Sequence, residues 1–265
     1  MLKNRKTNQT VKSASFTLRV INNGTISKRG IFIGDSLTQE GGYINQIQNV
    51  LSNGNIVSVG TRTETDTPGY TIYHEGRSGW SAYDYTEQAS KGTVNNAFWN
   101  SSTSSFDFSY YMTTNNFSNI DFVMLNLGTN GYNQTSRTVD AISEMITSIH
   151  DYDPNIKIFV SLIPPATNQD GCGQHNGMFS SGNYKYYQLL LIQNYLSNFQ
   201  DEIENVYVTE AYFNIDIQYD FPRKTVAVSS RNPYEITIND NNVHLNRYGY
   251  LKLADVYYNN LLRRL

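Results

Sequence analysis

Two polar residues stand where buried strands are predicted to end, and both are of types that take part in acyl transfer. Ser36 follows the short apolar run at 31–33, and Asn130 follows the longer run at 121–127. A serine hydroxyl in a glycine-containing turn after a buried strand can act as a nucleophile, and an asparagine amide can stabilise an oxyanion. Both residue types are also common in turns and helix caps, so neither one alone indicates an enzyme.

A histidine near the C-terminus could supply a base for such a serine. His244 lies directly before a predicted final helix, and Asp240 stands four residues upstream. A histidine with a nearby acid can serve as an oriented general base. The alternative is a surface histidine beside a helix cap at Asn246.

A fourth segment, HEGRSGWS, covers residues 74–81. Its glycines, Gly76 and Gly79, would let the backbone approach a ligand closely. Taken alone, the segment is a weak indication of a site.

In this order, the four segments resemble the SGNH hydrolases, also called the GDSL family of esterases and lipases. The resemblance rests on Gly34-Asp35-Ser36-Leu37, Ser78-Gly79-Trp80, Gly128-Thr129-Asn130 and Val243-His244-Leu245-Asn246. It covers roughly residues 28–265, and four blocks in order are far more specific than one tetrapeptide. The resemblance implies a three-layer α/β/α flavodoxin-like fold with a five-stranded parallel sheet.

The resemblance also implies a role for individual residues. Ser36 would be the nucleophile, and His244 would take its proton. The N–H groups of Ser36 and Gly79 and the side chain of Asn130 would form the oxyanion hole, with Gly76 as the alternative to Gly79. No metal or other cofactor is implied.

The sequence departs from the family pattern at two positions. Gly131 follows Asn130, where the family usually has an aspartate. The family's acid stands three residues before its histidine, and here that position is Asn241, with Asp240 one residue further back. We predict that Asp240 orients His244. The alternatives are Asn241 or a backbone carbonyl, and an asparagine could not stabilise the imidazolium as a carboxylate does.

Two long stretches predict the kind of substrate. Residues 61–120 and 212–243 are rich in Tyr, Thr, Ser and Asn rather than in apolar residues. Such loops suit a hydrated carbohydrate, with Trp80 and Trp99 as candidates for stacking on sugars. The segment at 74–80 also looks like that of carbohydrate O-acetylesterases of this family. The tyrosine-rich sequence and the N-terminal strand are similar to esterase modules in phage tail and baseplate proteins.

We therefore predict a serine esterase that removes short acyl groups, in particular O-acetyl, from a carbohydrate through an acyl-serine intermediate. Its partner would be an acylated polysaccharide or another ester substrate. One alternative is a lipase or thioesterase of the same family, with an apolar acyl tunnel. The other is a glycan-binding module with weakened catalysis.

Short strands alternating with helical patterns predict the elements that bring these residues together. Strands are expected at 31–33, 55–59, 121–127, 156–162 and 206–208, and helices at 44–51, 139–149, 184–199 and 247–264. Such alternation favours a parallel sheet covered on both faces. In such sheets ligands bind at the carboxyl ends of the strands, where Ser36 and Asn130 are expected.

Composition and charge exclude several classes. The chain has 265 residues, a net charge of −3 and only 16% charged residues, so nucleic-acid binding through a basic surface is not expected. The sequence contains no run of eighteen apolar residues, so no membrane-spanning helix is predicted. Residues 28–265 form the expected hydrolase domain, and 1–27 an extended lead-in with a strand at 14–22.

The chain begins with MLKNRKTNQT, which is basic but is not followed by the apolar stretch of a signal peptide. The expected substrate and the likeness to phage modules favour an extracellular or virion-associated placement. They also favour membership in a larger multidomain or virion assembly.

Metal and thiol chemistry are not expected. The single cysteine, Cys172, excludes an intrachain disulfide and lies in a predicted loop without a paired base. The candidate ligands lack metal-binding spacing. They are His74, Glu75, His150 and His175.

Overall fold

The computed structural model of the protein describes residues 2–3, 10–12, 26–66, 70–165, 181–200, 204–241 and 243–265. The strand predicted at 14–22, Cys172 and His175 lie outside the described residues.

A central sheet carries the predicted parallel strands, and this confirms the α/β fold class. The five predicted strands pair in parallel in the order β13-β12-β11-β3-β4. Their bounds are β3 Lys28–Gly34, β4 Ile56–Val59, β11 Phe122–Asn126, β12 Lys157–Ser161 and β13 Val206–Thr209.

Two further strands extend the sheet to seven. The sequence pattern did not predict β5 (Arg62–Asp66) and β6 (Tyr70–Gly76). Strand β6 pairs in parallel with the last two residues of β3, while β4 pairs with its first half. Strand β5 pairs antiparallel with β6. Its sequence, RTETD, has no apolar run, because an edge strand leaves much of its surface exposed to water.

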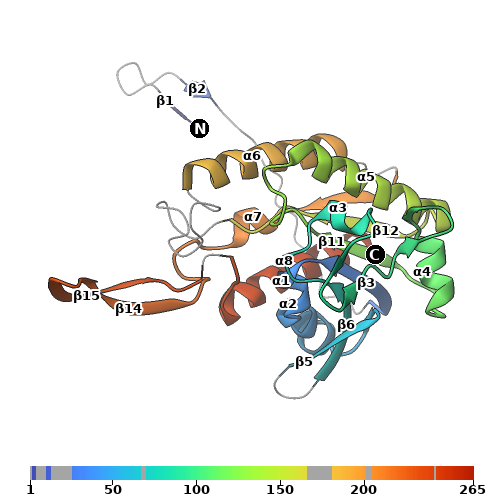
Figure 1. The fold of residues 1–265 in the computed structure, drawn as a ribbon, viewed down its shortest axis with the longest axis horizontal. Coiled ribbons are helices and arrows are strands. Elements are labelled where there is room, and N and C mark those ends of the chain that lie inside the picture. Colours follow the sequence, from blue (N-terminus) through green and yellow to red (C-terminus); the bar gives the residue numbers. More distant parts are fainter. Residues whose placement is uncertain are drawn as a thin grey trace.

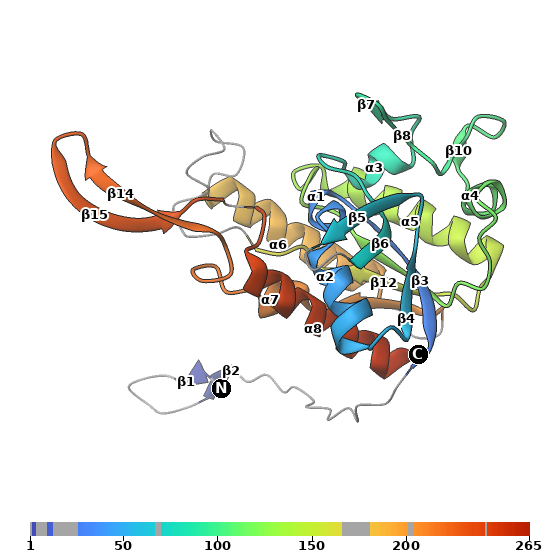
Figure 2. The same ribbon diagram turned by 90° about the horizontal axis from the view of Figure 1, so that it is seen from below.

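Helices cover both faces of the sheet (Figure 1, and Figure 2 at right angles). The long ones match the predicted helical patterns closely, and the short ones lie near the ends of strands. The helices are α1 Ser36–Gln39, α2 Gly42–Asn45, the π-helical η1 Gln46–Leu51, α3 Ala82–Tyr85, α4 Phe108–Thr114, α5 Thr135–Tyr152, α6 Ser181–Asn198, α7 Ala211–Asn214 and α8 Arg247–Arg264.

Two hydrophobic cores hold the three layers together. Because side chains alternate along a strand, Ile31 and Ile33 enter one core and Phe32 enters the other. The first core packs β3, β11 and β12 against α4, α5 and α6. The second packs the opposite face against α2, η1 and α8. Each fully buried large apolar side chain contributes about 1.5–3 kcal/mol, so both faces stabilise the sheet.

Smaller strand pairs lie outside the central sheet. Strands β14 (Arg223–Ser229) and β15 (Asn232–Asn239) form an exposed antiparallel hairpin that projects from the body of the protein (Figures 1 and 2). The other pairs are β1 Leu2–Lys3 with β2 Thr10–Lys12, β7 Ser90–Lys91 with β8 Val94–Asn95, and β9 Trp99–Asn100 with β10 Ser105–Phe106. The hairpin leads directly into the loop that carries His244.

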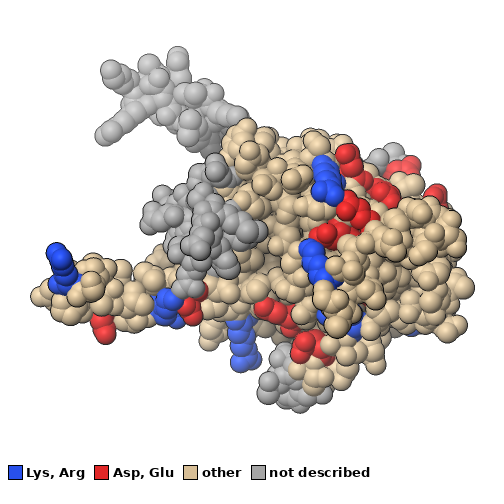
Figure 3. Space-filling model, in the orientation of Figure 1, with Lys and Arg blue, Asp and Glu red and all other residues tan. Residues whose placement is uncertain are grey.

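The surface is mostly uncharged on the face shown in Figure 3, where small groups of acidic and basic side chains lie interspersed. Within the described residues, no helix combines the length and apolar character needed to cross a membrane.

Candidate active site

Residues 34–40, here called the nucleophile segment, carry Ser36 at the carboxyl end of the sheet. Strand β3 ends at Gly34, and α1 starts at Ser36. The Asp35 carboxylate caps this short helix by accepting a hydrogen bond from the N–H of Leu37 at 3.0 Å. Ser36 is only 8% exposed, so most of this residue is shielded from solvent.

Burial gives Asp35 unusual acid–base properties. Desolvation raises its pKa to about 7, although the hydrogen bond from Leu37 partly opposes the shift. A carboxyl group with this pKa carries a substantial neutral fraction near pH 7. Its role next to Ser36 is structural, because its oxygen is occupied by the helix cap.

His244 meets the serine directly. Its Nε2 lies 2.8 Å from Ser36 Oγ, although 208 residues separate the two in the chain. This is the separation at which an imidazole can remove a hydroxyl proton. The geometry brings together the two residues that the sequence assigned as nucleophile and base.

Side-chain hydrogen bonds hold the described residues 240–241 and 243–246, here called the histidine segment. Asn241 Oδ1 accepts hydrogen bonds from the N–H groups of Val243 and His244, each at 2.9 Å. Asn246 caps α8 by accepting from Gly249 N–H at 3.0 Å, which confirms the cap suggested by the sequence. Its Nδ2 donates to the carbonyls of Tyr219 and Phe221. Polar contacts therefore fix this loop where it leaves the hairpin, and the buried side chain of Leu245 anchors it to the core that lies between the sheet and α8.

The structure does not bring Asp240 to His244. The Asp240 carboxylate pairs with Lys224 Nζ at 2.8 Å, and half of its side chain is exposed. Its backbone N–H donates to the carbonyl of Pro222 at the base of the hairpin. Because that base directs the side chain towards Lys224, the expected orienting contact of Asp240 is replaced by an ion pair on the surface.

Two other groups lie beside His244 Nδ1. Glu40 Oε1 is 3.3 Å away and Asn241 Nδ2 is 3.4 Å away. Asn241 is one of the alternatives indicated by the sequence, whereas no local sequence pattern around His244 indicates Glu40. The available signal was spacing: Glu40 lies four residues after Ser36, so one helical turn places both on the same side of the nucleophile segment.

The predicted oxyanion donors lie around one turn. Residues 77–80 form a turn closed by Trp80 N–H donating to Arg77 O at 3.1 Å, and Gly79 adopts a left-handed φ of 74° there. Gln39 Oε1 accepts from Ser78 N–H at 2.9 Å, which ties this turn to the nucleophile segment. Asn130 Nδ2 donates to Trp80 O at 3.1 Å. All three predicted donors therefore belong to elements in mutual contact.

The alternative donor, Gly76, is occupied elsewhere. Its N–H donates to His74 Nδ1 at 3.0 Å inside the protein. A Cβ at this position would lie 2.3 Å from the backbone nitrogen of Gln39, so glycine is needed to pack β6 against α1. These contacts favour Gly79 over Gly76 as the oxyanion donor.

A buried ion pair lies next to the turn at 77–80 and stabilises it. Arg77 Nη1 lies 2.8 Å from Glu75 Oε2, and both side chains are almost fully buried. Glu75 Oε1 also accepts from Tyr111 OH at 2.8 Å, and the Arg77 guanidinium lies over the rings of Trp80 and Tyr85. The Tyr85 hydroxyl donates to Gly34 O at 2.7 Å, so the network reaches the end of β3.

Trp80 is part of this core and is only 1% exposed, so it cannot stack on a sugar as the sequence suggested. Trp99 is partly exposed.

The histidines other than His244 serve structural roles where they are described. Burial lowers the pKa of His74 to about 4, so its neutral ring accepts the Gly76 N–H. His150 Nε2 lies 3.2 Å from Ile156 O after α5. Among the described residues, no group of three His, Cys, Asp or Glu side chains could hold a metal ion.

Comparison with known proteins identifies relatives of this architecture. The family model described as GDSL-like Lipase/Acylhydrolase matches residues 31–256. A search of curated proteins gives no match.

Several solved structures share the fold. A carbohydrate esterase family 3 protein from Talaromyces cellulolyticus has a TM-score of 0.56 at 18% identity, covering 89% of this chain and 97% of that one. A family 3 carbohydrate esterase from Clostridium thermocellum has the same TM-score and coverage at 19% identity. The M. smegmatis aryl esterase has a TM-score of 0.54 at 14% identity, covering 90% of this chain and 100% of that one.

Proposed function

Because the chain belongs to the GDSL-like lipase/acylhydrolase family, and is thus an esterase or acylhydrolase by descent, we propose that it removes short acyl groups from a carbohydrate. The acyl group we propose is O-acetyl. The observation that carries the proposal is the 2.8 Å contact between Ser36 Oγ and His244 Nε2 at the carboxyl end of the sheet.

The proposed mechanism begins with proton transfer. His244 Nε2 takes the Ser36 hydroxyl proton as Oγ attacks the ester carbonyl carbon, and the carbonyl π electrons move to oxygen. The N–H groups of Ser36 and Gly79 and the amide of Asn130 stabilise the resulting oxyanion. Collapse breaks the bond to the sugar oxygen, which leaves with the proton from His244.

An acyl-serine remains after the first half of the reaction. Water then attacks its carbonyl carbon while His244 removes the water proton. Collapse of the second tetrahedral intermediate returns the proton to Ser36 Oγ and releases the carboxylic acid.

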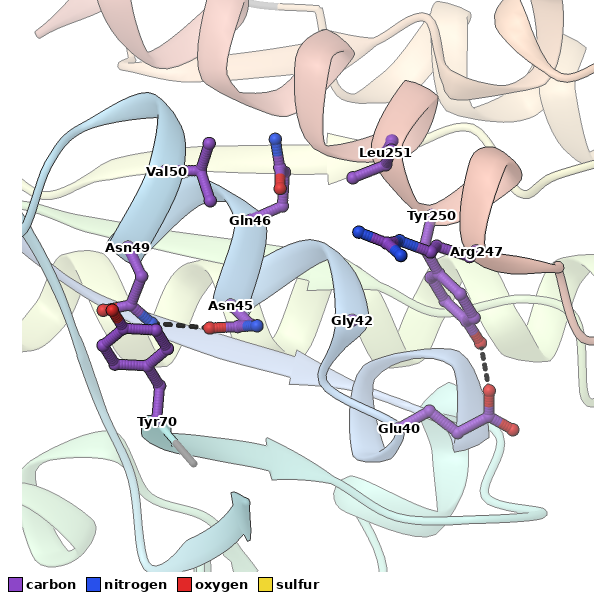
Figure 4. Close-up of a pocket in the computed structure, with 10 residues that line it drawn as sticks. All are labelled: Glu40, Gly42, Asn45, Gln46, Asn49, Val50, Tyr70, Arg247, Tyr250 and Leu251. Atoms are coloured by element: carbon purple, nitrogen blue, oxygen red, sulfur yellow. Dashed lines mark hydrogen bonds between the residues drawn. The ribbon is translucent and has the colours of Figure 1, made fainter. Parts of the chain in front are cut away.

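A groove that includes Glu40 carries several hydrogen-bonding side chains among apolar ones such as Val50 and Leu251, and this lining supports a hydroxyl-rich substrate. It has a volume of about 620 Å³ and lies between the α2–η1 helices and α8 (Figure 4). Its lining includes Asn45, Gln46, Asn49 and Arg247, and it shares Glu40 with the surroundings of His244. Amide and guanidinium groups can hydrogen-bond to sugar hydroxyls, whereas an acyl chain would need an apolar tunnel.

Exposed aromatic rings near the histidine segment add to this support. Tyr219 is 59% exposed and Tyr248 is 69% exposed, and both neighbour Asn246 in contact or in sequence. Aromatic faces of this kind suit the apolar faces of sugar rings. The similarity in fold to carbohydrate esterases points in the same direction.

The test compares esters of different chain length and a real polysaccharide. Wild type and Ser36→Ala are assayed with p-nitrophenyl acetate, butyrate and octanoate, and acetate release is measured from acetylated xylan. We expect serine-dependent hydrolysis that falls at least about tenfold from acetate to octanoate, together with acetate release from the glycan. A preference for octanoate would replace the proposal with a lipase, and equal rates for the two proteins would overturn the esterase assignment.

A further inference from the structure

The histidine segment lacks an acid at the position where the resemblance predicts one, and the residue found there is already in use. Asn241 Oδ1 accepts the N–H groups of Val243 and His244 at 2.9 Å each. Turning the amide over to present this oxygen to the imidazole would leave both N–H groups without their acceptor. Asn241 therefore shapes the loop.

The amide group that Asn241 does direct towards the ring is a donor. Its Nδ2 lies 3.4 Å from His244 Nδ1. An N–H donor can pair with Nδ1 only when that nitrogen carries no proton, and the neutral ring then carries its proton on Nε2. In that tautomer Nε2 cannot accept the Ser36 proton, so Asn241 alone would favour the inactive form of the base.

Glu40 offers the opposite preference. Its Oε1 lies 3.3 Å from His244 Nδ1, and a carboxylate oxygen only accepts hydrogen bonds. A hydrogen bond to this oxygen requires a proton on Nδ1, and that tautomer leaves Nε2 free to accept from Ser36 Oγ at 2.8 Å. The three side chains form a continuous chain from carboxylate to imidazole to hydroxyl.

A buried tyrosine fixes the carboxylate in this place. Tyr250 OH donates to Glu40 Oε2 at 2.6 Å, and Figure 4 shows this contact at the end of the groove. Burial, together with the negative charge of Glu40, raises the pKa of Tyr250 well above its usual range, so the phenol keeps its proton. With Oε2 held by Tyr250, Oε1 is directed towards the imidazole.

We propose that Glu40, held by Tyr250, is the carboxylate that orients His244 and stabilises its positive charge in this enzyme. The proposal deepens the proposed esterase function and rests on it. Glu40 does not touch the reacting atoms; it acts through the imidazole. The nucleophile segment thereby supplies both ends of the chain, Ser36 at its start and Glu40 at its end.

The other charged groups near the pair do not provide this contact. Asp240 is paired with Lys224. Asp35 is buried and caps α1, and Arg247 lines the groove from α8. Among the groups that the structure describes around His244, Glu40 is the carboxylate in contact with the ring.

The first test is kinetic and uses matched carboxylate variants. Glu40→Gln keeps the size of the side chain and the oxygen that accepts from Tyr250 but removes the negative charge. Asp240→Asn likewise removes the charge of the other candidate carboxylate while keeping its size. With p-nitrophenyl acetate we expect Glu40→Gln to lower kcat about 10²–10³-fold, somewhat less than the roughly 10⁴-fold loss that the corresponding change causes in a serine protease. Asp240→Asn should stay within about twofold of wild type, and Tyr250→Phe should lose a few-fold.

A rescue experiment separates orientation from general damage. Asn241→Asp places a carboxylate at the position that the family pattern predicts. In the Glu40→Gln background, this second change should restore at least about tenfold of the lost kcat. A wild-type kcat in Glu40→Gln, or a loss that Asn241→Asp does not restore, would overturn the proposal.

The second test does not depend on activity. Long-range ¹H–¹⁵N correlation spectra distinguish the two neutral tautomers of histidine, and His244→Ala identifies the signal among the four histidines. In Ser36→Ala protein we expect His244 to be protonated on Nδ1, and we expect Glu40→Gln to shift it towards Nε2–H. An unchanged tautomer in Glu40→Gln, or a change in Asp240→Asn instead, would overturn the assignment.

These two tests distinguish the failure of the inference from the failure of the proposed function. If wild type hydrolyses the ester and Ser36→Ala does not, a silent Glu40→Gln refutes only the role of Glu40. If wild type has no esterase activity, the tautomer measurement still decides whether Glu40 orients the ring.

Discussion

The nucleophile segment and the histidine segment meet at one hydrogen bond but are held in place by different means. Residues 34–40 follow a buried central strand whose last residue pairs with β6 and β11 on its two sides. The histidine segment follows an exposed hairpin, and the side chains of Asn241 and Asn246 hold it by hydrogen bonds. The sheet sets the position of the first segment, whereas polar contacts and the buried side chain of Leu245 set the position of the second.

This difference indicates that the nucleophile segment tolerates few substitutions, whereas the histidine segment can lose its own acid. The backbone of Gln39 in the nucleophile segment leaves no room for a Cβ on Gly76. The carbonyl of Gly34 accepts a hydrogen bond from the Tyr85 hydroxyl. In the histidine segment, the acid can be supplied from outside the loop, because only the ring must be placed. Glu40 supplies it from the rigid side.

The largest effect should come from the two residues that join the segments. Ser36→Ala and His244→Ala should each lower kcat by about 10⁵–10⁶, because nucleophile and base act as a unit. The double variant should lose no more than either single variant. Kinetics with p-nitrophenyl acetate check this. A fold-loss of kcat in the double variant equal to the product of the two single fold-losses would show that the two residues act independently.

Breaking the buried ion pair should destabilise the sheet side without touching the histidine segment. Glu75→Gln leaves the Arg77 guanidinium buried without its counter-charge, and we expect a loss of about 3–5 kcal/mol in the free energy of unfolding. Urea unfolding gives the value. The matched control is Glu64→Gln on edge strand β5, which should change stability by less than about 0.5 kcal/mol.

The oxyanion donor from β11 should have an intermediate effect. Asn130→Ala removes one amide donor, and we expect kcat to fall about 10²–10³-fold with KM little changed. Asn133→Ala, an exposed neighbour in the same loop, serves as the control. A loss below tenfold in Asn130→Ala would remove this residue from the oxyanion hole.

The buried Asp35 should make stability depend on pH. Its pKa is about 7 in the folded protein and near 4 in the unfolded chain, so the folded state binds more protons between these values. Stability should therefore fall as pH rises through this window, by about 2–3 kcal/mol between pH 5 and pH 8. Asp35→Asn should lack this term.

Urea unfolding of wild type and Asp35→Asn at both pH values gives the measurement. His74 contributes with the opposite sign, because its lowered pKa makes stability fall as pH drops below its ordinary value. The difference between the two proteins cancels the His74 contribution. A difference that does not vary with pH would contradict a raised pKa at Asp35.

The smallest effect should come from loosening the histidine segment. Asn246→Ala removes the α8 cap and the ties to Tyr219 and Phe221, which should cost about 0.5–2 kcal/mol in stability. We expect a several-fold loss in kcat with no change in acyl-chain preference. Thermal unfolding and the ester assay check this, and a loss as large as that of His244→Ala would show that the loop is not held by several contacts.

The buried parallel strands of the central sheet could be predicted from the apolar runs in the sequence. Apolar runs such as 121–127 are typical of buried strands in a sheet covered on both faces. Ser36 and Asn130 each follow such a run, so their position at the carboxyl end of the sheet could be predicted. Strand β5 could not be predicted, because this edge strand, RTETD, carries no apolar run. Strand β6, YTIYHEG, lies inside the sheet but has one fully buried apolar residue, Ile72, so its sequence gives no clear strand pattern either. Helix α8 and its cap at Asn246 were clear from the sequence pattern.

The partner of His244 was the least predictable part of the site. Proximity in sequence favoured Asp240, but side-chain direction depends on the hairpin base and on Lys224, which no local pattern encodes. Glu40 is distant from His244 in the chain and meets it because α2, which follows Glu40, packs against α8, which follows His244. Contacts between loops and helices far apart in sequence follow from tertiary packing.

The most direct test of the Ser36–His244 pairing is covalent labelling with a fluorophosphonate, which reacts with activated serines. Intact mass and peptide mapping should show one adduct on Ser36 in wild type, none in Ser36→Ala, and labelling slowed at least about 10²-fold in His244→Ala. An adduct on another residue, or labelling of Ser36 at the same rate without His244, would contradict the account.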